Sequence, residues 1–290
     1  MSERFAYLAD GPASVDGAVR AIAPALELEL VEVSADSGAS RALDDSEAAL
    51  HLAAQTLGLV ESLGLTRVLT SSDAVTLHLR RSVHRLAADV ALRDRVNARL
   101  AEVGAPPTSG AVDVQHLVWE LASERALVML HEHSVRPLED LRVALLRGCQ
   151  ILRPSRDLGA SEQDLLRPLA RVIAACGASE VPIESGSGCC GAACTETRPE
   201  IALGAAAVPL VEAIDADAEA LVVASSRCYA MLRDRREQIA RNVDRGLGLP
   251  VLHVSQLVAL AFGLREGELQ LDRVSAGSRA LADRLAAPSS

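Results

Sequence analysis

The chain has 290 residues, which is long enough for two domains that each bury a core of their own. Its formal net charge of -10 excludes a nucleic-acid partner, because surfaces that bind phosphate backbones start from clustered positive charge. All 29 basic residues are arginine, so the sequence also excludes a phosphate-binding loop that depends on lysine.

The first half alternates predicted strands and helices. Residues 1–11 contain no apolar run long enough for a signal peptide, so we expect a cytoplasmic protein. Strands are predicted over 5–8, 29–33 and 66–70, with helices over 47–63, 75–86 and 112–130. A turn or short linker is predicted over 104–110, which is rich in Gly, Pro and Ser.

The second half repeats this order. Strands are predicted over 142–146, 179–183 and 220–224, and a helix over 201–216. The uncharged stretch 246–264 contains Pro250, His253 and Gln256, which favour a strand running into a capped helix over a membrane span. The sequence therefore predicts an α/β protein with two tandem copies of a small parallel sheet flanked by helices, residues 1–138 and 139–290.

Four cysteines of the second half follow predicted strands: Cys149, Cys189, Cys190 and Cys228. Glycines on both sides of the adjacent pair let the chain bend until both sulfurs face one object. The carboxyl ends of parallel strands meet at one edge of a sheet, where helix N-termini offer N–H donors to thiolates. This pattern favours an iron–sulfur cluster, and the alternatives are a zinc ion or a set of unrelated buried cysteines.

The remaining cysteines and the histidines are weaker candidates. Cys176 lies on the apolar face of a predicted helix and is expected in the core. Cys194, four residues after Cys190, is a possible additional ligand. The pair His131 and His133 is expected to be solvated. Two further histidines, His116 and His253, are expected to be hydrogen-bonded core residues.

With these motifs in place, the sequence resembles the catalytic B component of heterodisulfide reductase and its relatives, which are built from two cysteine-rich CCG domains. The resemblance covers nearly the whole chain, and the Cys149 and Cys189-Cys190-Gly191 segments are its most specific parts. The matching segments are 95–104, 112–117, Arg136-Pro137-Leu138, 148–154, 189–191 and 250–257.

The resemblance implies a cluster in the second domain only. A complete CCG domain contributes five cysteines to a noncubane iron–sulfur cluster. This chain has four of them, with Ser225 in the fifth place. An alkoxide is a poor iron ligand, so a four-cysteine form or recruitment of Cys194 is expected, of noncubane or 4Fe-4S type.

The first domain departs from the family pattern. Its positions at or near the family cysteines are Gly11, Ser37, Gly38, Ser71 and Ala74. A degenerate domain with a structural or docking role, and no cluster, is therefore expected.

The resemblance further implies a redox subunit of a heterodisulfide-reductase-like complex. It would transfer electrons to or from a thiol or disulfide, with ferredoxin-like iron–sulfur and flavoprotein subunits as partners. The sequence has no flavin or nicotinamide fingerprint of its own. Two alternatives stay open: a pure electron relay, as in the CCG subunit of some succinate dehydrogenases, and a scaffold without a cluster.

Overall fold

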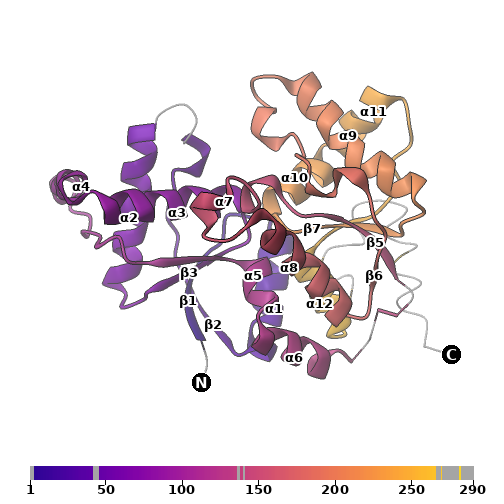
Figure 1. The fold of residues 1–290 in the computed structure, drawn as a ribbon, viewed down its shortest axis with the longest axis horizontal. Helices are drawn as coiled ribbons and strands as arrows, with labels where there is room; N and C mark the ends of the chain where they lie inside the picture. The colour runs from indigo at the N-terminus through magenta and orange to yellow at the C-terminus, as the bar shows by residue number, and fades with distance from the viewer. Residues whose placement is uncertain are drawn as a thin grey trace.

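The first half of the chain forms a parallel sheet with the order β2-β1-β3-β4 (Figure 1). The computed structural model describes residues 3–41, 46–135, 138–139, 141–265, 269 and 281. The strands are β1 (Glu3–Leu8), β2 (Leu28–Glu32), β3 (Arg67–Thr70) and β4 (Asp113–His116). The helices are α1 (Ala13–Ile22), α2 (Ser46–Ser62), α3 (Asp73–Ala88), α4 (Val90–Glu102), α5 (Leu117–Leu121) and α6 (Glu124–His133), with short 3-10 turns at Pro24–Leu26 and Ala39–Arg41.

The second half repeats the same permutation, with the order β6-β5-β7-β8 and every pairing parallel. Its strands are β5 (Arg142–Leu146), β6 (Ser179–Glu180), β7 (Ala220–Val223) and β8 (Val251–His253). Its helices are α7 (Ser155–Leu158), α8 (Glu162–Ala175), α9 (Pro199–Asp215), α10 (Ser226–Asp234), α11 (Arg236–Val243) and α12 (Val254–Ala261), and 3-10 turns span Cys149–Ile151, Glu184–Ser187 and Ala192–Cys194. The predicted α/β fold with two tandem copies is confirmed.

The predicted helix over 112–130 is wrong in its first part. Residues Asp113–His116 form β4, which pairs with β3, and two short helices follow. The segment Asp113-Val114-Gln115-His116 is the counterpart of β8, which also ends in a histidine that caps the next helix. The apolar spacing beyond it suggested one helix, whereas Ser123 caps a new helix and divides the segment.

The strand predicted over 179–183 is shorter than expected. Only Ser179 and Glu180 pair as β6, although the Val181 N–H still donates to the Val143 carbonyl at 2.8 Å. Pro182 has no N–H with which to continue the ladder, so the chain leaves the sheet there. The following loop carries the adjacent cysteines.

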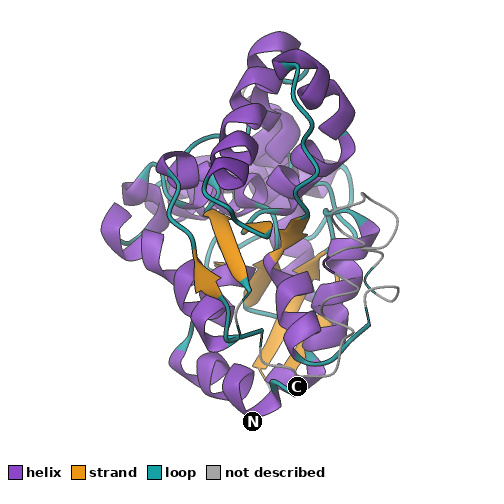
Figure 2. Ribbon diagram, turned by 90° about the vertical axis from the view of Figure 1, so that its right-hand side faces the viewer, coloured by secondary structure: helices purple, strands orange, loops and turns teal. Residues whose placement is uncertain are grey.

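Aliphatic side chains fill a core that both sheets share. The strands lie in the middle with helices on the outside (Figure 2), and every residue of β7 is fully buried. Helix α12 of the second half packs against α1 of the first half, and one core cluster includes Phe5, Leu117, Val143 and Leu257. The two halves are therefore joined by apolar contacts as well as by the chain.

The division of the chain near residue 138 stays a prediction. The segment that leads into the second half includes Arg136 and Pro137, which lie outside the described residues, as does most of the chain after residue 265. Among the helices described, none combines the length and apolar character that crossing a membrane requires.

Candidate functional site

Cys149 is presented by a glycine turn at the end of β5. Gly148 adopts φ +83° and ψ 113°, a conformation that favours glycine, and Cys149 then opens a 3-10 turn. A Cβ atom on Gly148 would lie 3.4 Å from Oδ2 of Asp73, which belongs to the first half. The loop therefore carries its thiol to the boundary between the two halves.

The adjacent cysteines lie in the loop after β6, directly behind the 3-10 turn Glu184–Ser187. Gly191 follows them with φ +79°, and a Cβ atom there would approach the Ala202 carbonyl of α9 to 2.3 Å. The Gly191 N–H donates to Sγ of Cys189 at 3.4 Å. This turn leaves Cys189 exposed and directs Cys190 into the interior, where it is 4% exposed.

Cys228 lies within the first turn of α10, not before it. The helix begins at Ser226, and Cys228 is 2% exposed. The first turn of a helix carries free N–H groups and a partial positive charge, which stabilise negatively charged sulfur. Cys228 is thus at a helix N-terminus, as expected, but on a buried helical face.

The structure brings all four predicted ligands together. Cys149 and Cys189 share a hydrogen bond between their thiols, and so do Cys190 and Cys228. The two pairs also interact with each other, because Cys149 is close enough to feel both Cys190 and Cys228 electrostatically. Three loops, after β5, β6 and β7, therefore supply one group of thiols.

The thiols have strongly perturbed acidities. The hydrogen bond from Cys149, with help from the Gly191 N–H and Arg227, lowers the pKa of Cys189 to about 6. The same hydrogen bond, burial and the charge of Asp73 raise the pKa of Cys149. The hydrogen bond to Cys190 and burial raise the pKa of Cys228. Cys189 is therefore the thiolate of the group, and its partner Cys149 keeps the proton.

Ser225, in the place of the family's fifth cysteine, is occupied by another contact. It is fully buried and caps α10 by accepting from the Arg227 N–H at 3.3 Å. Its hydroxyl donates to Oδ1 of Asp73 at 2.8 Å and accepts from the Asp73 N–H at 3.3 Å. The Ser225 hydroxyl thus connects the two halves of the chain.

Sequence reasoning missed Asp73. It is the first residue of α3 and is 2% exposed, and its Oδ2 accepts from the Gln150 N–H at 3.3 Å, directly after Cys149. One signal was available. When Ser71-Ser72-Asp73-Ala74 is aligned on Ser225-Ser226-Arg227-Cys228, the two copies carry opposite charges at the third position.

Cys194 has no part in the two thiol pairs. It ends the 3-10 turn after Gly191 and lines a cleft of about 700 Å³ between the halves, whose other walls include Gln150, Arg81 and Arg227. The cleft therefore opens beside the Cys149 loop, and the predicted role of Cys194 as an additional ligand stays a prediction.

The other cysteine and the histidines lie where the sequence predicted. Cys176 is fully buried at the end of α8, and His131 and His133 are exposed. His116 and His253 are fully buried at equivalent places, each accepting at Nδ1 from the N–H two residues on, at 3.2 Å. Burial lowers the pKa of each of these two histidines to about 3.

The first half has a cavity where the second half has thiols. A space of about 390 Å³ lies at the ends of its strands, lined by Asp10, Ser37, Ser72 and Ala74 together with Arg227 of the second half. Nearby, the Tyr7 hydroxyl donates to Asp16 at 2.6 Å. Oxygen atoms and a methyl group thus line the position equivalent to the thiol group.

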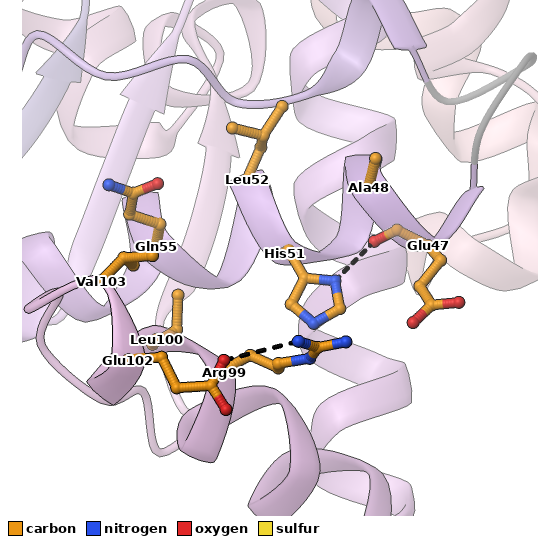
Figure 3. A pocket seen from close by; sticks show the side chains of 9 residues that line it. All are labelled: Glu47, Ala48, His51, Leu52, Gln55, Arg99, Leu100, Glu102 and Val103. Atoms are coloured by element: carbon orange, nitrogen blue, oxygen red, sulfur yellow. Dashed lines mark hydrogen bonds and ion pairs between the residues drawn. The ribbon is translucent and has the colours of Figure 1, made fainter.

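Another cavity, of about 480 Å³, lies on the first half between α2 and α4 (Figure 3). His51 Nδ1 bonds to the Glu47 carbonyl there at 2.9 Å, and Arg99 pairs with Glu102 at 3.4 Å. No cysteine is among its lining residues. It is separate from the thiol group.

Within the described residues, no three side chains of His, Cys, Asp or Glu converge as a single metal ion would require. The sulfurs instead form two contacting pairs. This geometry limits which metal group the site suits.

Comparisons with known proteins agree with this architecture. The family model described as "Cysteine-rich domain", CCG, matches residues 143–233, which include all four thiols. The chain is 33% identical over 260 residues to the 8-methylmenaquinol:fumarate reductase membrane anchor subunit of Wolinella succinogenes, covering 88% of each chain.

Two further relatives bear the name that the sequence suggested. A protein of Archaeoglobus profundus, named for its likeness to the B component of heterodisulfide reductase, is 28% identical, with 86% of this chain and 85% of that protein covered. The B component of the ferredoxin/F(420)H(2)-dependent CoB-CoM heterodisulfide reductase of Methanosarcina acetivorans is 29% identical, with 77% and 74% covered.

Among solved structures, a hypothetical protein from Helicobacter pylori has a similar fold. The TM-score is 0.67 at 12% identity, and the match covers 94% of this chain and 53% of that one. This chain thus spans about half the length of that structure.

Two parallel sheets of identical strand order, with a thiol group after the strands of the second, define a tandem cysteine-rich-domain protein. The chain belongs to the family of the heterodisulfide reductase B component and its relatives.

Proposed function

We propose that this chain is an iron–sulfur redox subunit of a multi-subunit reductase, with one cluster bound by Cys149, Cys189, Cys190 and Cys228. The observation that carries the proposal is the meeting of these four thiols, from three loops, in two contacting pairs. The family membership supports it, since the relatives are named as subunits of reductases.

The donor set suits a cluster better than a zinc ion. All the donors are sulfur, which fits either group. A zinc ion needs its ligands around one point, whereas the ligands of a cluster attach to different irons and lie further apart. The division of the thiols into two pairs, with no three acidic, histidine or cysteine side chains converging within the described residues, therefore favours the cluster.

A cluster on these thiolates would supply reversible one-electron transfer. The surrounding chain does the rest. The Gly191 N–H donates to Cys189, and Arg227 contributes positive charge near the same sulfur. Burial of Cys190 and Cys228 keeps water from that side, while Cys189 stays exposed. Electrons would therefore enter or leave on the Cys189 side.

Anaerobic purification with iron and acid-labile sulfide analysis tests the proposal. The wild type should contain several irons per chain, Cys189→Ser should lose most of them, and Cys176→Ser should keep them. Cys176 is the matched control because it is a fully buried cysteine outside the group. Under one iron per chain in the wild type, with an unchanged spectrum in Cys189→Ser, would instead support a scaffold.

A thiol or disulfide is the first candidate for the reacting partner. The cleft of about 700 Å³ beside Gln150 has room for a small molecule and opens near the exposed Cys189. Reduction of a disulfide to two thiols takes two electrons and two protons, so a one-electron site must act twice for each substrate. A flavoprotein or ferredoxin-like iron–sulfur subunit would supply the electrons.

A pure electron relay is the second candidate. The first half carries no cysteine, and a relative with 33% identity belongs to a fumarate reductase. Mixing the reduced protein with bis(2-hydroxyethyl) disulfide separates the two candidates. Release of two thiols for every two electrons consumed supports the reductase, whereas a reduced protein that this disulfide leaves unoxidised supports the relay. A cytoplasmic location is part of the proposal in either case.

A further inference from the structure

The strongest unexplained feature near the thiols is the buried carboxylate of Asp73. It comes from the first half of the chain but makes its contacts in the second. It accepts from the Ser225 hydroxyl at 2.8 Å and from the Gln150 N–H at 3.3 Å. Those two residues flank the group, since Gln150 follows Cys149 and Ser225 occupies the place of a fifth ligand.

The space for this carboxylate is built into the fold. Gly148 leaves room that a side chain would reduce, since a Cβ there would lie 3.4 Å from Oδ2. The Ser226 N–H donates to the Ser71 carbonyl at 2.9 Å, which fixes the start of α10 against the segment that carries Asp73. Asp73 also opens α3, where the helix dipole favours a negative charge.

The charge of Asp73 has no basic partner among the described residues. Its side-chain partners are a hydroxyl and a peptide N–H, both neutral. It is 2% exposed, so water screens it poorly. It acts electrostatically on Cys149, Cys189 and Cys228, so its field extends over the whole thiol group.

We infer that Asp73 is a positioning residue of the thiol site, which holds the Cys149 loop and Ser225 in place and makes reduction of the site harder through its negative charge. Reduction adds one electron from an external donor to a group that is already negative, with no bond formed or broken. A fixed negative charge nearby opposes that addition and lowers the reduction potential. This inference rests on the proposed function.

A redox titration of the full chain, followed by electron paramagnetic resonance, tests the inference. Asp73→Asn removes the charge and keeps the shape, so its midpoint potential should shift to a more positive value. Asp73→Glu keeps the charge and should stay nearer to the wild type. Asp157→Asn is the matched control, because Asp157 pairs with Arg81 across the same interface at 2.6 Å and should leave the potential unchanged.

The outcomes separate the inference from the proposed function. A wild type without iron overturns both. A wild type with iron whose potential is matched by Asp73→Asn, or an Asn variant shifted to a more negative value, overturns the inference alone. An Asn variant with the wild-type circular dichroism but no iron supports the positioning role. If Asp73→Asn does not fold, the smaller neutral variant Asp73→Ser takes its place with the same expected direction.

Discussion

Arg227 occupies in the second half the position that Asp73 occupies in the first, and the two side chains act on the same sulfur with opposite sign. Asp73 raises the pKa of Cys189, whereas Arg227 lowers it. Each lies in the first turn of the helix that follows the third strand of its half. The internal duplication has therefore placed an acid and a base on opposite sides of one group of thiols.

The lowered pKa of Cys189 predicts selective alkylation of the metal-free protein. At pH 7 iodoacetamide should modify Cys189 first, because its pKa is about 6 and it is exposed. Cys176 should react slowest, since burial raises its pKa to about 12. Mass spectrometry of the digested protein measures both rates. A Cys189 rate that is half-maximal near pH 9, the ordinary value for a thiol, would contradict the prediction.

Ser225→Ala should destabilise the protein more than the loss of a helix cap alone. It removes the cap of α10, worth about 1 kcal/mol, and leaves Oδ1 of buried Asp73 without its donor, which costs about 1–3 kcal/mol more. Ser123→Ala, which removes only the cap of α6, is the control. Urea denaturation gives the free energies of unfolding, and equal losses in the two variants would argue against the Asp73 contact.

Gly191→Ala should disrupt the loop of the adjacent cysteines. The new Cβ would approach the Ala202 carbonyl to 2.3 Å, on a residue with φ +79°, so we expect a loss of about 2–4 kcal/mol and less bound iron. Gly64→Ala separates the two causes, because Gly64 has φ +69° and no atom within 4 Å of such a Cβ. Thermal unfolding and iron analysis are the measurements. A Gly191 variant no worse than the Gly64 variant would exclude the clash.

The two buried histidines predict acid destabilisation. The pKa of each is about 3 in the folded chain and 6.5 as its ordinary value. Between these values the unfolded chain binds more protons, so the free energy of unfolding falls as the pH drops from 6.5 toward 3, by up to about 5 kcal/mol for each histidine.

Urea denaturation of the metal-free chain at several pH values measures this slope. His253→Asn can still cap α12 but cannot take up a proton, so its stability should depend less on pH over the same range. A variant with the wild-type slope would show that His253 is not the titrating group.

The repeated strand–helix order and the cysteines placed after strands were predictable from the sequence, because apolar runs and loop residues are local signals. β4 was not, since Asp113-Val114-Gln115-His116 is short and continues into helical spacing. Its assignment as a strand depends on pairing with β3.

Asp73 was missed for a related reason. An aspartate at the start of a helix is ordinary in a sequence, and its contacts with Ser225 and Gln150 span 152 and 77 positions. Only the fold brings such distant segments together. The same holds for the division of the four thiols into pairs.

The packing of α12 against α1, with the Ser255 hydroxyl donating to the Val15 carbonyl at 3.4 Å, has a consequence for the half that has no thiols. Cutting the polypeptide between the sheets would leave each piece with an uncovered aliphatic flank, prone to aggregate. Half a gene would therefore not yield a working miniature, and the cysteine-free partner is retained because the other piece needs it as a wall.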